Sequence, residues 1–139
     1  MTSVGNGDGA PEMRLVVTAP DYAEALAFYR DVLGLPQLAA FDDGAGRVTI
    51  LDAGRATLEL SDIPHAEHID AVEVGRRVAG HIRVAFAVPD AAAATDRLAA
   101  AGATLIAPPV LTPWGSLNSR LDAPGGLQLT LFQNLEPEL

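Results

Sequence analysis

Two stretches of the chain repeat one pattern, and this repeat limits the possible folds more than any other feature. LVVTAPD at 15–21 and VAFAVPD at 84–90 are apolar runs that end in Pro-Asp, and each leads into a helical pattern. Asp21 and Asp90 are suited to cap these helices, because a short carboxylate accepts hydrogen bonds from the free amides of a first turn. The repeat predicts a strand followed by a helix in each half of the chain.

The two halves also end alike. The first helical pattern stops at Gly34, and the second, which is alanine-rich, stops at Gly102. GRATLEL at 54–60 and GGLQLTL at 125–131 are matching late strands. Between helix and late strand each half has room for two more short strands, which we expect near 38–42, 47–53, 104–108 and 117–122. The sequence therefore predicts an α+β fold of two tandem β-α-β-β-β modules.

The repeat sets the boundaries along the chain. We expect a disordered N-terminal segment at 1–12, a first module at 13–61, a linker at 62–80, a second module at 81–133 and a C-terminal tail at 134–139. The linker carries His65 and His68 with Glu67 between them. Two such histidines can bind a metal ion, but an exposed linker without a third ligand is the simpler interpretation.

Alternation along the strands assigns side chains to the two faces of the sheet. Leu15 and Val17 lie on an apolar face suited to pack under a helix, whereas Arg14 lies on the other face. That second face mixes small, polar and charged residues. It can face solvent, as one face of many sheets does. A lined cleft is the interpretation we favour, because Ala85 leaves space and Phe132 is poorly suited to open solvent.

Composition limits the partners. The chain has 18 acidic and 9 basic residues, a formal net charge of −9, so nucleic acid and anionic membranes are disfavoured. It has no cysteine, which excludes disulfides, thiolate catalysis and cysteine-bound metals. The segment 1–12 lacks an apolar signal core, and no later stretch reaches about 18 apolar residues. We therefore expect a cytoplasmic protein.

The amino-acid sequence of the two modules resembles sequences of the vicinal oxygen chelate superfamily. This superfamily includes glyoxalase I, extradiol dioxygenases, fosfomycin-resistance enzymes and bleomycin-resistance binding proteins. The resemblance rests on YAEALAFYRDVLGL at 22–35, on GRATLEL at 54–60 and on TPWGSLNSRLDAPGGLQLTLF at 112–132. FYRDVLGL is the most specific part, and the likeness covers 14–133. It implies an eight-stranded, partly open, barrel-like cleft. It also implies a homodimer whose clefts are commonly shared between the first module of one chain and the second of the other.

The resemblance further implies where a metal ion would bind. Metal-using members place four ligands, typically histidine or glutamate, on the concave face. The matching positions here are Arg14, Glu59, Arg83 and Thr130, and only Glu59 is of a type that binds metals. His81 shares a strand face with Arg83 and would need a shift of register to become a ligand.

Arginine is permanently charged and has no lone pair to donate, so two arginines facing one cleft would oppose a divalent cation. We expect no metal ion and no other cofactor. Our hypothesis is that an ion pair between Arg14 and Glu59 fills the space of the metal. Alternatively, both arginines satisfy the ends of the sheet or face solvent.

Without a metal ion, the resemblance points to the drug-binding members. Our first interpretation is a metal-independent protein that binds and sequesters a bulky aromatic natural product or antibiotic, and so confers resistance. Aromatic residues would stack on the ligand and polar residues would orient it, although Phe41, Trp114 and Phe132 can also be core or loop packing. The expected ligand-binding residues are Arg14, Phe41, Glu59, His81, Arg83, Trp114, Asn118, Thr130 and Phe132.

Two enzymatic alternatives stay open. One is a metal-dependent lyase or isomerase of the glyoxalase or dioxygenase type that uses Glu59 and His81. The other is a metal-free enzyme, in which one of these residues is a general base and Arg83 holds an anionic intermediate. The sequence identifies no catalytic residue, because no nucleophile, base and orienting group stand in a recognisable arrangement.

Overall fold

The computed structural model describes residues 9–124 and 126–135. Most of the predicted N-terminal segment and C-terminal tail, 1–12 and 134–139, lies outside them. The predicted α+β fold of two β-α-β-β-β modules is confirmed. The first module comprises β1 (Glu12–Thr18), α1 (Tyr22–Leu26) continued by the π-helical segment η1 (Ala27–Val32), β2 (Gln37–Asp42), β3 (Arg47–Asp52) and β4 (Thr57–Ser61). The second comprises β5 (Ile82–Ala87), α3 (Ala91–Ala100), β6 (Thr104–Leu111), β7 (Ser116–Ala123) and β8 (Leu127–Asn134).

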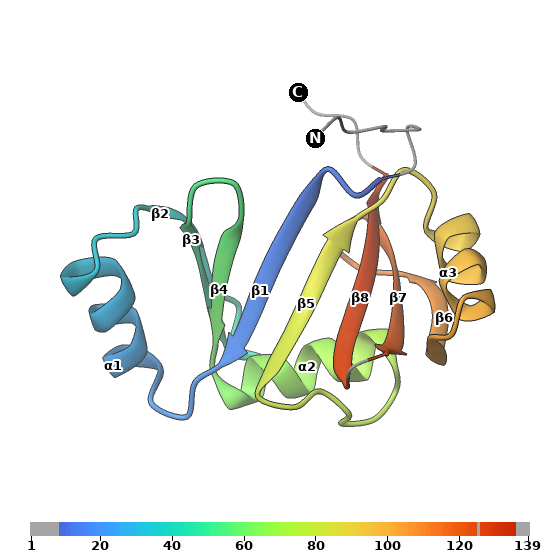
Figure 1. Cartoon of the computed structure of the whole chain (residues 1–139). Helices are drawn as coiled ribbons and strands as arrows, with labels where there is room; N and C mark the ends of the chain where they lie inside the picture. The colour runs from blue at the N-terminus through green and yellow to red at the C-terminus, as the bar shows by residue number, and fades with distance from the viewer. Residues whose placement is uncertain (1–8, 125, 136–139) are drawn as a thin grey trace, which may run out of the picture.

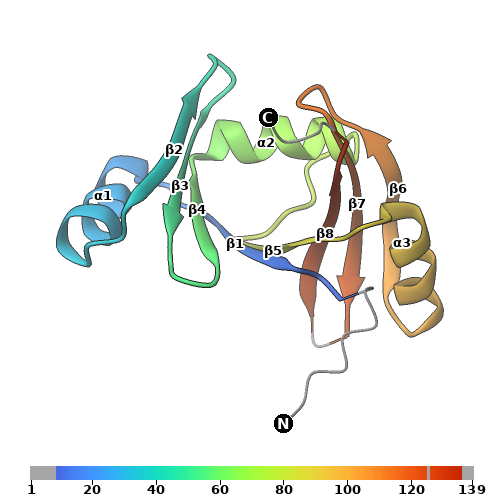
Figure 2. The ribbon, with the colours of Figure 1, turned by 90° about the horizontal axis from the view of Figure 1, so that it is seen from above.

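The strands form one mixed sheet in the order β2-β3-β4-β1-β5-β8-β7-β6 (Figure 1). Within each module the first and last strands are parallel, and β1 and β5 join the modules as an antiparallel pair in the middle. The sheet curves into a trough whose two walls are the outer strands of the two modules (Figure 2). A single chain therefore builds both halves of its trough.

Two helices cover the outer side of the trough, one for each module (Figure 2). Asp21 and Asp90 cap them as predicted, each accepting a hydrogen bond of 3.0 Å from the amide three residues later. Under α1 lies an apolar cluster that includes Leu51 and Leu60, and under α3 lies another that includes Leu121. The apolar strand faces are thus buried, which leaves the mixed face on the concave side.

The prediction of an exposed linker at 62–80 is wrong, because this segment contains α2 (Ile63–Glu73), which runs across the concave side between the two walls (Figure 2). Asp62 caps it by accepting a hydrogen bond of 2.9 Å from the amide of His65. Asp70 and Glu73 are only 1% and 3% exposed. The sequence analysis missed this helix because its buried face carries two carboxylates beside a single small apolar residue, Ala66.

The carboxylates of α2 are compensated by Arg120 of β7, whose side chain is 0% exposed. Its guanidinium donates to Asp70 Oδ1 at 2.8 Å and to Glu73 Oε1 at 2.6 and 3.2 Å. A buried ion pair of this kind is strongly destabilised when one partner is lost. These contacts fasten α2 to the second module.

Asp70 also holds the chain that follows α2. Its Oδ2 accepts hydrogen bonds from the Arg77 side chain at 2.9 Å and from the amides of Val78 and Ala79 at 2.8 Å each. Burial alone would raise the pKa of Asp70, but these amides, with Arg120 and Arg77, outweigh burial and keep the pKa below its ordinary value.

In the described part of the chain, no helix has the length and apolar character needed to cross a membrane.

Candidate functional site

The concave side of the sheet holds a cavity of about 610 Å³. Strands of both modules line it, together with α2 and the turn between β6 and β7. Eight of the nine predicted ligand-binding residues lie on its surface, and the ninth, His81, does not. The eight are Arg14, Phe41, Glu59, Arg83, Trp114, Asn118, Thr130 and Phe132.

The expectation that His81 faces the cleft is wrong. Alternation would place it beside Arg83 only if the strand extended that far, but β5 begins at Ile82. His81 is exposed, and its backbone carbonyl accepts a hydrogen bond of 2.9 Å from the amide of Thr18. The register shift that a metal-binding role for His81 required is therefore absent.

The histidines that do line the cavity are His65 and His68 of α2. They share one face of the helix because they are three residues apart. The sequence signal that could have found them is Asp62 followed by Pro64, since an N-cap residue with proline in the first turn is a helix start. Burial lowers the pKa of His65, although the nearby Asp62 and Asp43 oppose this.

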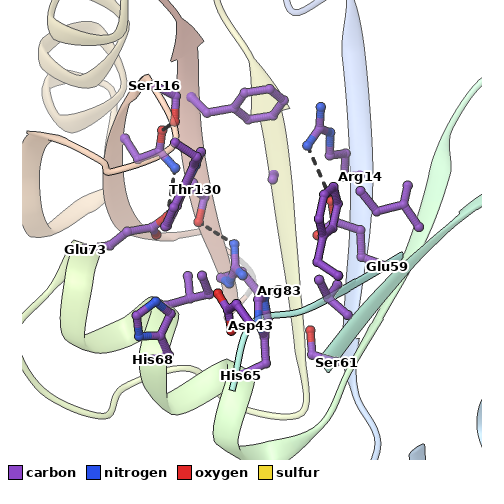
Figure 3. Close-up of a pocket in the computed structure, with 18 of the residues that line it drawn as sticks. Arg14, Asp43, Glu59, Ser61, His65, His68, Glu73, Arg83, Ser116 and Thr130 are labelled. Atoms are coloured by element: carbon purple, nitrogen blue, oxygen red, sulfur yellow. Dashed lines mark hydrogen bonds and ion pairs between the residues drawn. The ribbon is translucent and has the colours of Figure 1, made fainter. Parts of the chain in front are cut away.

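The predicted ion pair between Arg14 and Glu59 is confirmed, with 3.4 Å between Arg14 Nη1 and Glu59 Oε1 (Figure 3). Arg14 also contacts Glu12 at 2.7 Å and lies 4.5 Å above the ring of Phe132. Burial raises the pKa of Glu59, and the positive charges of Arg14 and Arg83 offset this only in part. The pKa of Glu59 therefore lies above that of an exposed glutamate.

Arg83 points into the same cavity from β5, where its Nη1 donates to Thr130 Oγ1 at 2.7 Å (Figure 3). Burial lowers the pKa of Arg83, as does repulsion by Arg120, while the negative charges of Glu73 and Glu59 act in the opposite direction. The alternative that both arginines only satisfy the ends of the sheet or face solvent is thus wrong, because both line the cavity.

These side chains do not fit a divalent cation. The four positions that the family resemblance assigns to metal ligands hold two guanidinium groups, one hydroxyl group and one carboxylate already paired with an arginine. Guanidinium groups have no lone pair and repel a cation. Within 9–124 and 126–135, histidine and carboxylate side chains form no group of three or more suited to a metal ion.

Glu73 reaches the cavity from the end of α2, and both oxygens of its carboxylate accept hydrogen bonds. While Oε1 accepts from Arg120, Oε2 accepts from Asn118 Nδ2 at 2.7 Å. Asn118 in turn accepts from Ser116 Oγ at 2.7 Å. Sequence reasoning missed Glu73 because it assigned this segment to the linker. Its carboxylate is held rigidly and serves to position this wall of the cavity.

Two aromatic side chains are exposed on opposite walls of the cavity. Phe41, on β2, is 57% exposed, and Trp114, in the turn between β6 and β7, is 47% exposed. Phe132, in contrast, is buried below Arg14. An aromatic side chain left open to water on a cavity wall offers a flat apolar surface to a ligand.

A family model described as the Glyoxalase/Bleomycin resistance protein/Dioxygenase superfamily matches residues 13–131. The chain is also similar to hypothetical protein BH1468 from Bacillus halodurans C-125, with 18% identity and a TM-score of 0.65 over 96% of this chain and 99% of that chain. No curated protein matches it.

Two further solved structures have the same fold. Methylmalonyl-CoA epimerase from Streptomyces coelicolor, in complex with 2-nitronate-propionyl-CoA, has 18% identity and a TM-score of 0.63, over 93% of this chain and 99% of that chain. A glyoxalase/bleomycin resistance protein/dioxygenase superfamily member from Vibrio splendidus 12B01 has 15% identity and a TM-score of 0.62, over 88% and 98%. At such identities the likeness establishes the fold alone.

Proposed function

We propose that this chain, which belongs to the glyoxalase/bleomycin resistance protein/dioxygenase superfamily, binds a bulky, flat small molecule in its concave cavity without a metal ion. The observation that carries the proposal is the presence of Arg14 and Arg83 where the family resemblance expects metal ligands. A cavity of about 610 Å³ suits a drug-sized molecule, since such sites typically measure roughly 300–1,000 Å³.

The aromatic walls support a flat ligand. A molecule of a few fused rings can contact Phe41 on one side and Trp114 on the other, and each aromatic contact adds roughly 0.5–1.5 kcal/mol beyond area burial. We propose sequestration of an aromatic natural product or antibiotic, and hence resistance, as the biological role. A cytoplasmic location and a homodimeric assembly belong to the same proposal.

Trp114 provides the test, because it is the sole tryptophan of the chain and lines the cavity. A neutral flat probe, 2-naphthamide, should quench its fluorescence saturably. The probe should be recovered unchanged by mass spectrometry after prolonged incubation. Phe41→Ala should weaken binding, whereas the exposed Phe28→Ala, on the outer helix, should not. Absence of saturable binding by this probe and by its carboxylate analogue would refute the proposal.

A second candidate is a metal-free enzyme that moves a proton, and the raised pKa of Glu59 favours it. A carboxylate of this kind can take a proton from an acidic C–H group, while a nearby guanidinium stabilises the anion that forms. Incubation of bound compounds in D₂O separates the two functions. Deuterium uptake that is lost in Glu59→Gln supports the enzyme, and unlabelled ligand supports sequestration.

A further inference from the structure

Arg83 differs from the other arginines around the cavity. Arg14 pairs with Glu12 and Glu59, and Arg120 pairs with two carboxylates of α2. No carboxylate oxygen of the described residues lies within 4.0 Å of an Arg83 nitrogen. A partly buried guanidinium is stable when an anion and hydrogen-bond acceptors surround it. Within the described part of the chain, the one side-chain acceptor that Arg83 meets is the Thr130 hydroxyl.

Among the residues that the structure describes, Arg83 is the arginine of the cavity lining that has no direct ion pair. Glu59 shares Arg14 with Glu12, and Glu73 shares Arg120 with Asp70. The remaining carboxylates on the lining, Asp42 and Asp43, are exposed, where water screens them. Arg83 at the floor therefore lacks a carboxylate in direct contact among the described residues, and a ligand carboxylate would supply one.

Thr130 adds a second donor at the same place. Its Oγ1 accepts a hydrogen bond from Arg83 at 2.7 Å, which leaves the hydroxyl hydrogen free to point to another acceptor. The guanidinium fork and this hydroxyl can therefore both donate to one carboxylate. An arginine fork matches the two oxygens of a carboxylate in a way that a point charge does not.

Space for the rest of the ligand lies next to this donor pair. Ala85 is the strand neighbour of Thr130 on one side and of Arg14 on the other. Its short side chain lines the cavity floor between them. A ring attached to the carboxylate can lie over Ala85 and reach the aromatic walls.

We propose that Arg83 and Thr130 bind the carboxylate of a monoanionic, flat aromatic ligand, an inference that rests on the proposed function and names its ligand class. The two side chains take the place of the family's metal ion as the group that holds the ligand's oxygens. A dianion such as an aryl phosphate fits less well, because Glu59 and Glu73 line the same cavity.

The test compares three probes of one shape, 2-naphthoate, 2-naphthamide and 2-naphthyl phosphate, by Trp114 fluorescence. Wild type should bind 2-naphthoate most tightly. Arg83→Gln should weaken binding of 2-naphthoate roughly 10- to 100-fold, as expected for loss of a hydrogen bond to a charged group, and should weaken binding of the uncharged 2-naphthamide much less. Arg55→Gln, in an exposed turn, is the matched control and should bind all probes as wild type does.

Two further variants keep the proposal testable if Arg83→Gln does not fold. Arg83→Lys keeps the charge but loses the fork, and Thr130→Val removes the hydroxyl, so each should reduce the preference for 2-naphthoate over 2-naphthamide. Equal binding of these two probes by wild type, or tightest binding of the phosphate, overturns this inference and leaves the proposed function standing. Failure of all three probes to bind overturns both.

Discussion

Replacement of Arg120 by methionine tests how α2 is held against the second module. Methionine fills a similar length but donates no hydrogen bond. The change removes the two contacts of Glu73 Oε1, at 2.6 and 3.2 Å, and the contact of Asp70 Oδ1 at 2.8 Å. Both carboxylates are nearly inaccessible to water. Two buried carboxylate oxygens would then lack a donor.

The expected cost follows from this geometry. Loss of one partner from a buried ion pair costs roughly 3–5 kcal/mol. We expect about 4 kcal/mol, because Glu73 keeps Asn118 and Asp70 keeps Arg77 on their other oxygens. For a chain of this length that corresponds to a fall in Tm of roughly 10–15 °C.

Urea unfolding followed by circular dichroism measures the change, with Arg55→Met as the matched exposed control, expected within about 0.5 kcal/mol of wild type. Adding Glu73→Gln to Arg120→Met removes one uncompensated buried charge and should recover part of the loss. The buried pairs do not hold α2 as described if the free energy of unfolding of Arg120→Met lies within about 1 kcal/mol of the wild-type value. The same conclusion follows if the added Glu73→Gln substitution lowers the stability further.

Two further predictions concern the same helix and its surroundings. Gly46→Ala should lower the free energy of unfolding in urea by about 1–3 kcal/mol more than Gly44→Ala does. Both glycines have positive φ, but a Cβ at Gly46 would overlap the backbone of His65, whereas a Cβ at Gly44 would meet no atom. Equal losses for the two variants would contradict this packing. Stability should fall as the pH drops below about 6.5, because the pKa of His65 is lower in the folded chain, so that the unfolded chain binds more protons in this range. His65→Gln should lack this loss of stability at low pH, whereas His81→Gln, at an exposed position, should keep it. An identical dependence of stability on pH for wild type and His65→Gln would refute the assignment of this loss to His65.

The parts of the fold that follow local rules could be predicted from the sequence. The repeat fixed the two modules, and Asp21 and Asp90 marked the helix starts that the structure has. Strict alternation placed Arg14 and Arg83 on the mixed face of the sheet, because a strand has a period of two, and the family resemblance matched both residues to positions on the concave face. The same rule failed for His81, since it holds only where the strand exists.

Features that depend on distant partners could not be predicted. α2 has no large apolar face for a sequence pattern to detect, because two of its buried residues are carboxylates, Asp70 and Glu73, which pair with Arg120 far along the chain. Its histidines were therefore assigned to a linker. The antiparallel pairing of β1 with β5 within one chain is a further feature of this kind. No local sequence pattern distinguishes it from the same pairing between two chains.

The central claim is that this cavity holds its ligand with arginine side chains and needs no metal ion. The most direct test is the Kd of the tighter of the two probes 2-naphthoate and 2-naphthamide, measured by Trp114 fluorescence after dialysis against a chelator and again after addition of Zn²⁺, Mn²⁺ or Co²⁺. We predict the same Kd in every case, with no metal ion retained by the dialysed protein. Binding that appears only when a metal ion is added, or near-stoichiometric metal that survives dialysis, would contradict the account.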